Sequence, residues 1–194
     1  MAENQNSNRP AHGKKSADAL REQRRAAREA VLALLFETEY HEDESPETIY
    51  LRAAAARGID TTDRYIRKEY YGIMEHLPAI DALLARHAKG WRTDRLSRVS
   101  RAVLRLGAYE VVYADKIPTP VAINEAVELA KKFDDPKARA FINGVLNAIK
   151  NELEQNGGVI PEVEVPAEEA PAEAVAADVL PEADAAVATA PDAE

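Results

Sequence analysis

The residues with the clearest chemical potential are arginines near the start of the chain. Residues 21–28 read Arg-Glu-Gln-Arg-Arg-Ala-Ala-Arg, and the apolar run Val-Leu-Ala-Leu-Leu-Phe follows at 31–36. At the helical period of about 100° per residue, the four arginines fall within roughly a 100° arc of one helix. They are Arg21, Arg24, Arg25 and Arg28. Guanidinium groups displayed on a rigid helix are suited to binding phosphate.

The same helix has an apolar side that can anchor it. Ala27, Val31 and Leu34 point about 100° from the middle of the arginine arc, so we expect this side to be buried and the arginines to stay in water. Leu32 and Phe36 fall near one edge of the arc, rather than on the core side. An aromatic ring beside arginines favours stacking on unpaired bases.

Two interpretations of this basic face are open. In the first, the arginines bind the phosphates of a nucleic acid, and Lys14 and Lys15 extend the positive surface. In the second, they form only a solvated helix face that pairs with Glu22 and Glu29, where each pair contributes about a few tenths of a kcal/mol.

The net charge of −9 belongs to the C-terminal tail. Residues 157–194 hold ten acidic side chains and no Lys or Arg, which leaves 24 acidic against 25 basic side chains in the rest of the chain. The tail is rich in Ala, Pro and Glu and has no helical apolar period, so we expect it to be disordered. We expect a flexible leader over residues 1–15 and one folded domain over residues 16–156.

The composition also narrows the class of protein. The chain has no Cys, no apolar run near the ~20 residues of a membrane span, and no signal-peptide pattern at its N-terminus. We therefore expect a cytoplasmic protein that does not bind membranes. The four histidines do not converge, and no nucleotide-binding, hydrolase or metalloprotease motif is present. We expect no catalytic residue, no cofactor and no metal.

Helical periodicity runs through the whole domain, which predicts an all-α fold. The first helix is expected from about residue 16 to about residue 40. Ser45-Pro46 starts a second helix that Gly58 ends. Thr62 caps a long third helix, which Pro78 kinks or splits.

The second half of the domain follows the same rules. Gly90-Trp91 makes a turn before a helix that reaches about residue 114. Thr119-Pro120 begins a helix that ends near Phe133, and Asp135-Pro136 begins the last helix. Three glycines inside helices, at positions 72, 107 and 144, are expected to permit close helix crossings.

Two stretches carry a resemblance to a known family. They are Ala-Val-Leu-Arg-Leu-Gly-Ala-Tyr-Glu at 102–110, and Val-Ala-Ile-Asn-Glu-Ala-Val-Glu-Leu-Ala-Lys-Lys-Phe at 121–133 with Phe-Ile-Asn-Gly-Val-Leu at 141–146. Together with the arginine-rich helix start, they closely resemble the NusB family of bacterial transcription antitermination factors. The similarity covers roughly residues 22–155.

The resemblance implies a single helical domain of about six to seven helices in two packed subdomains. It implies binding to boxA, a short single-stranded element of ribosomal RNA leader transcripts, together with NusE, a small-subunit ribosomal protein. The pair then acts on RNA polymerase so that transcription resists premature termination. Family members differ in whether they are monomers or homodimers, and the sequence leaves both open.

The resemblance also assigns residues. Arg24, Arg25 and Arg28 match the family's arginine-rich motif. Phe36 stands where a tyrosine is familiar, and Phe141 matches the aromatic residue of the Phe-Ile-Asn-Gly motif, so both are expected to stack on bases. One departure is Ala26, where a third consecutive arginine can occur, and Lys14, Lys15 and Arg21 can supply that charge. Asn124 and Asn143 belong to the signature, and they are expected to bridge backbone groups at a buried helix crossing rather than to touch a ligand.

Two alternatives stay open beside an RNA-binding transcription factor. One is a relative of the N-terminal domain of rRNA cytosine methyltransferases, although no Gly-rich cofactor loop follows residue 156. The other is a non-catalytic helical adaptor or dimerisation module, whose arginines are a solvated or self-associating face.

Overall fold

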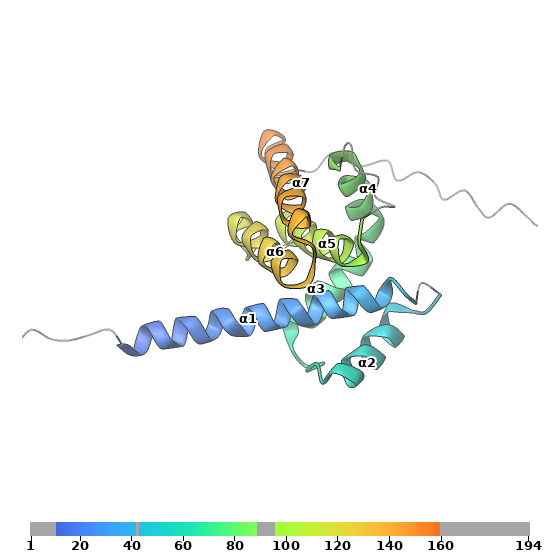
Figure 1. Ribbon diagram of the computed structural model, residues 1–194, viewed down its shortest axis with the longest axis vertical. Coiled ribbons are helices and arrows are strands. Elements are labelled where there is room, and N and C mark those ends of the chain that lie inside the picture. The colour runs from blue at the N-terminus through green and yellow to red at the C-terminus, as the bar shows by residue number, and fades with distance from the viewer. Residues whose placement is uncertain (1–10, 42, 89–95, 160–194) are drawn as a thin grey trace, which may run out of the picture.

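Seven helices make up the part of the chain that the structure describes. This computed structural model describes residues 11–41, 43–88 and 96–159 (Figure 1). The helices are α1 (Ala11–Thr38), α2 (Pro46–Arg57), α3 (Arg64–Glu75), α4 (Leu77–His87), α5 (Arg98–Val112), α6 (Thr119–Phe133) and α7 (Pro136–Gln155). No strand occurs over these ranges, and the predicted all-α fold is confirmed. The turn predicted at Gly90-Trp91 and the tail from residue 160 lie outside the described residues.

Several helix ends follow the predicted capping chemistry. The hydroxyl of Ser45 accepts a hydrogen bond from the backbone N–H of Thr48 at the start of α2, and Gly58 ends that helix in the left-handed conformation at φ 65°. The carboxylate of Asp135 caps α7 by accepting from the N–H of Lys137 at 2.8 Å. These local signals fix where the chain turns between helices.

Two predicted caps are wrong by one residue. Asp63, rather than Thr62, caps α3, because the carboxylate of Asp60 already binds both the N–H and the hydroxyl of Thr62 at 2.8 and 2.7 Å. Thr119 lies inside α6, whose N-cap residue is Pro118 and has no side-chain cap. The predicted break near Pro78 is confirmed, since α3 ends at Glu75 and α4 begins at Leu77.

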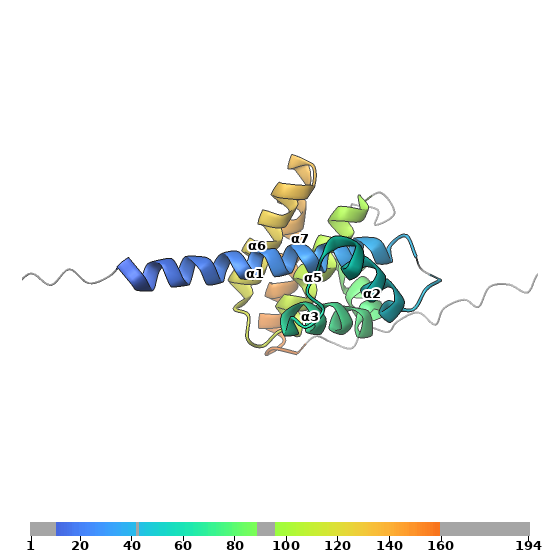
Figure 2. The same cartoon turned by 90° about the horizontal axis from the view of Figure 1, so that it is seen from below.

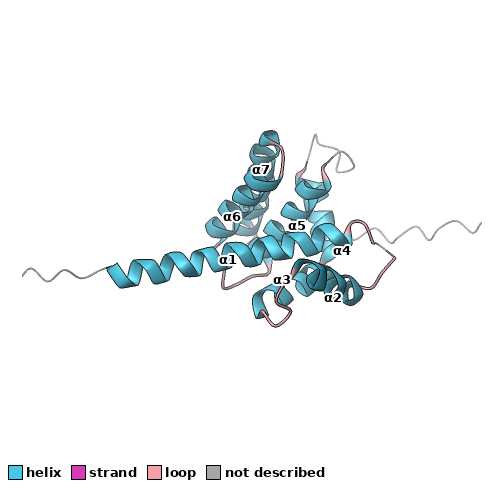
Figure 3. Cartoon of the chain, turned by 60° about the horizontal axis from the view of Figure 1, so that its bottom comes forward, coloured by secondary structure: helices cyan, strands magenta, loops and turns pink. Residues whose placement is uncertain are grey.

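The helices form two packed groups around a shared core. α1 packs on α2 and α3, while α5, α6 and α7 pack on one another, and α4 joins α5 and α7 (Figure 3). α5 is the central element, because its buried residues point in every direction around the helix and meet both groups. The arrangement agrees with the expected two subdomains.

Two of the three helical glycines do permit close crossings. A Cβ atom on Gly72 would lie 2.0 Å from the hydroxyl oxygen of Tyr109, and one on Gly107 would lie 2.7 Å from the side chain of Leu146. The expectation for Gly144 is wrong, because a Cβ atom there would meet nothing within 4 Å. α3 and α7 therefore approach α5 closely where these two glycines allow it.

α1 projects beyond the helical bundle. Figures 1 and 2 show its N-terminal part extending past the other helices. The helix begins at Ala11, about five residues earlier than expected, and every residue from 17 to 26 is exposed. Its second half enters the core, where Val31 and Leu34 are fully buried as predicted. The bundle thus holds one end of a rigid helix and leaves the other end in solvent.

Candidate nucleic-acid interface

The projecting half of α1 carries most of the predicted arginine face. Arg21, Arg24 and Arg25 are exposed. Arg21 lies 3.5 Å from Asp18, and Nε of Arg25 lies 3.4 Å from Glu125 of α6. Lys14 and Lys15 belong to the first turns of the same helix, but their side chains lie outside the described part of the chain. These exposed cations can reach an anionic ligand without unfolding any packed contact.

Arg28 departs from this pattern, and the expectation that it faces water is wrong. Only 4% of the residue is exposed. Its Nε donates to both carboxylate oxygens of Glu110 on α5, at 2.9 and 3.2 Å, and Nη1 lies 3.7 Å from Glu125. Arg28 is buried because α1 enters the bundle here and packs against α5. Its guanidinium also lies 5.7 Å from the centre of the Tyr65 ring.

The surroundings of Arg28 keep it charged. Burial has the largest single effect and acts to lower the pKa of Arg28. The Glu110 carboxylate, Tyr65, the hydrogen bond to Glu110 and the Glu125 carboxylate together outweigh it, so the pKa is raised. The Tyr65 hydroxyl donates a further hydrogen bond to Glu110 at 2.5 Å. Arg28 is therefore held within the protein by the carboxylates of Glu110 on α5 and Glu125 on α6.

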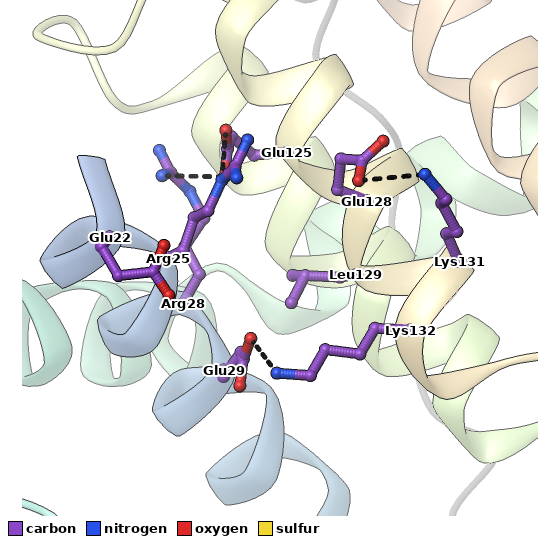
Figure 4. A pocket seen from close by; sticks show the side chains of 9 residues that line it. All are labelled: Glu22, Arg25, Arg28, Glu29, Glu125, Glu128, Leu129, Lys131 and Lys132. Carbon is purple, nitrogen blue, oxygen red and sulfur yellow. Dashed lines mark hydrogen bonds and ion pairs between the residues drawn. The ribbon is translucent and has the colours of Figure 1, made fainter. Parts of the chain in front are cut away.

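A hollow of about 360 Å³ lies between α1 and α6, beside the exposed arginines. Its lining residues, drawn in Figure 4, are Glu22, Arg25, Arg28, Glu29, Glu125, Glu128, Leu129, Lys131 and Lys132. Acidic and basic side chains alternate there: Lys132 lies 2.6 Å from Glu29, and Lys131 lies 3.6 Å from Glu128. A phosphate entering this hollow would exchange with carboxylates that now hold the cations.

The position of Glu125 in this hollow was not predicted from the sequence. This residue belongs to the Ile-Asn-Glu signature, and the structure places it against both Arg25 and Arg28. The contact joins residues about a hundred positions apart in the sequence, so no local pattern reports it. Lys131 and Lys132, which lie in the last turn of α6, were missed for the same reason.

Two aromatic side chains lie at the C-terminal end of α1 and just beyond it. Phe36 is half-buried, and its ring centre lies 5.2 Å from that of Tyr40, which is 54% exposed. The guanidinium of Arg98, at the start of α5, lies 4.0 Å from the centre of the Tyr40 ring. Tyr40 was not predicted to belong to this surface, although it follows Phe36 by only four residues. Leu32 is buried, so its predicted place beside the exposed face is wrong.

Phe141 lies apart from the hollow between α1 and α6. It is half-buried and packs against the hydrophobic core from α7. It does not line the hollow. The structure thus brings Arg25, Arg28 and the end of α6 together, with Phe36 further along α1, and leaves Phe141 on a separate helix. Asn124 and Asn143 are exposed, so the expectation that they bridge backbone groups at a buried crossing is wrong.

Other kinds of site find no support in the described ranges. No group of three or more His, Cys, Asp or Glu side chains there could hold a metal ion. Within the same ranges, no helix is both long and apolar enough to cross a membrane. The candidate site in this part of the protein is the charged surface of α1 and α6.

The fold and this surface define a small helical domain whose rigid first helix displays arginines outside the bundle. Residues 25–151 match the model of the NusB family, and the chain belongs to this family. It is 41% identical over 135 residues to the transcription antitermination protein NusB of Bacillus subtilis (strain 168), which covers 69% of this chain and 98% of that protein.

Solved structures agree with this assignment. The fold matches NusB of T. maritima with a TM-score of 0.61 at 38% identity, covering 66% of this chain and 91% of the other. It also matches a structure of the antitermination factors NusB and NusE in complex with double-stranded RNA, with a TM-score of 0.59 at 29% identity, covering 66% and 96%. A second relative, the protein of Bacillus velezensis that is 42% identical over 131 residues, is likewise named a transcription antitermination protein.

Proposed function

We propose that this protein is a non-enzymatic antitermination factor that binds single-stranded boxA RNA of ribosomal RNA leader transcripts in the cytoplasm. It does so together with NusE, and the assembly helps RNA polymerase to resist premature termination. The observation that carries the RNA-binding part is the exposed arginine face of α1, held outside the bundle beside the hollow that α6 lines. Membership of the NusB family, and a related structure that contains NusB, NusE and RNA, support the partner.

The proposed phosphate contacts differ in how exposed their arginines are. Arg21, Arg24 and Arg25 are exposed and would neutralise phosphates, with Lys14 and Lys15 extending the path toward the N-terminus. Arg28 would act at the inner end of the path, where its guanidinium borders the hollow. A phosphate arriving there would meet a guanidinium already oriented by Glu110.

The aromatic residues would supply affinity that depends little on salt. Phe36 and Phe141 are both half-buried, so each can pack against the protein on one face and a base on the other. Stacking contributes about 1–3 kcal/mol per base in single-strand complexes. Replacing either phenylalanine with Ala should weaken RNA binding without changing its salt dependence, because stacking releases few counterions. Loss of stability with intact binding by the folded protein would instead make both residues part of the core.

The test is a binding measurement with both partners. Fluorescence anisotropy of a labelled boxA oligonucleotide should show binding that tightens when purified NusE is added, and a scrambled RNA of the same length should bind more weakly. If this protein binds NusE but neither boxA nor scrambled RNA, it is a helical adaptor and the proposed RNA binding is wrong. Equal binding to boxA and scrambled RNA with NusE present would contradict boxA recognition.

A further inference from the structure

A second hollow, of about 270 Å³, opens between α6 and α7. Three asparagines line it: Asn124 from α6, and Asn143 and Asn147 from α7. Ile123 and Val127 add apolar surface, and Lys150 adds a cation. We call it the asparagine groove. Asparagine is a weak helix former, so three of them on the facing sides of two helices do not serve helix stability.

The amides of this groove keep free hydrogen-bonding groups. The side-chain amide of Asn147 donates to the backbone carbonyl and to Oδ1 of Asn143, at 2.8 and 3.1 Å. Nδ2 of Asn143 has no hydrogen-bond partner among the described residues. The side-chain amide of Asn124 has none there either. Both residues are exposed. The groove therefore presents hydrogen-bond donors and an acceptor to solvent.

The asparagine groove adjoins the hollow beside α1. Asn124 and Val127 lie one helical turn before Glu128 and Lys131, which line that first hollow. Figure 4 shows Lys131 on the side of α6 that faces away from α1. The outer face of α6 thus links the two hollows, and an extended strand that crosses it would pass from one to the other.

We propose that the asparagine groove binds one unstacked base of single-stranded RNA, next to the phosphates held by α1. This inference rests on the proposed function. Asn124 and Asn143 hydrogen-bond to the base edge, Ile123 and Val127 contact its ring, and Lys150 faces a neighbouring phosphate. An asparagine amide bonds in a bidentate manner to adenine, which offers a donor and an acceptor side by side. The expected base is adenine.

A base fits this groove better than a protein partner does. The residues that dominate protein–protein binding are large aromatic side chains and Arg in central pockets, and none of these lines the groove. The large exposed apolar residues of the described chain, such as Tyr40 and Leu51, do not line it either. The apolar side chains of the groove can contact the flat face of a base, and its asparagine amides can hydrogen-bond to the polar edge of the base.

The experiment compares two labelled 12-nucleotide RNAs, oligo(U) and the same strand with one adenine at its centre. Anisotropy titrations use the full chain, the double variant Asn124→Ala/Asn143→Ala and the control Asn151→Ala, which removes an exposed asparagine of α7 outside the groove. The wild type and the control should bind the adenine-containing strand about tenfold more tightly. The double variant should lose this preference, while the salt dependence of its binding stays unchanged.

The other outcomes overturn the inference. A wild type that binds both strands equally, or a double variant that keeps the preference, would exclude the groove as the base site. The proposed function would still stand if variants of the α1 arginines weaken binding. A double variant that keeps the RNA preference but no longer retains NusE in a pull-down would assign the groove to a protein. Circular dichroism checks that both variants keep the wild-type melting temperature.

Discussion

Arg28 and Arg25 lie one helical turn apart on α1, and the structure predicts opposite consequences for their replacement. Arg28→Ala would leave Glu110 buried, with only the Tyr65 hydroxyl as a partner, at a side-chain exposure of 1%. Removing one partner of a buried ion pair costs about 3–5 kcal/mol of stability. We expect a loss of about 3 kcal/mol, because the Tyr65 hydroxyl still donates a hydrogen bond to Glu110. For a chain of this size, that corresponds to a fall in melting temperature of about 6–12 °C. Arg25→Ala removes a half-exposed contact worth about 0–1 kcal/mol.

Thermal unfolding followed by circular dichroism measures both variants. A further variant, Arg28→Ala/Glu110→Gln, removes the unpaired buried charge and should recover part of the loss. If Arg28→Ala melts within about 2 °C of Arg25→Ala, the two arginines are equivalent solvated cations, and the structural role given to Arg28 is wrong.

Three further predictions follow from burial, packing and charge. Burial, with Glu110 nearby, raises the pKa of Glu69 from 4.5 to about 7, so the folded protein binds an extra proton between these values. Stability should therefore fall as pH rises from about 4.5 to 7, by on the order of 2–3 kcal/mol in urea titrations, and Glu69→Gln should flatten this dependence. Gly72→Ala should destabilise the fold, because the added Cβ overlaps the Tyr109 hydroxyl, whereas Gly144→Ala should stabilise it by up to about 1 kcal/mol in the same assay. Deleting residues 160–194, which hold all ten tail carboxylates, should raise affinity for scrambled RNA at low salt, and unchanged affinity would leave the tail with no effect on binding.

The local part of the fold could be predicted from the sequence, because its causes are local. Gly58 ends α2 for lack of a Cβ, Asp135 caps α7 with its own carboxylate, and Pro78 breaks a helix through its ring. The alternation of apolar and polar residues also placed Val31 and Leu34 in the core. Each of these outcomes depends on residues within one or two turns.

The candidate site could be predicted only in part, because its remaining features depend on which helices meet. Helical angles place Arg28 beside Arg25, but they do not tell how wide the buried face of α1 is, and α5 covers Arg28. The same cause buries Leu32. Glu125 reaches the arginines only because the fold places α6 beside α1. Gly144 lies in open space, which a sequence pattern cannot distinguish from a helix crossing.

The salt dependence of boxA binding tests the central claim most directly. With about three to five phosphates neutralised, the slope of log K against log salt should be roughly −2 to −3.5. Replacing Arg21, Arg24 and Arg25 with Ala should flatten it by about 2, since single strands contribute about 0.7 per phosphate. A control variant changes the charge equally by replacing Arg52, Arg57 and Arg64 of α2 and α3 with Ala. It should keep the wild-type slope. An unchanged slope in the α1 variant, or equal flattening in both, would contradict RNA binding through the arginine face.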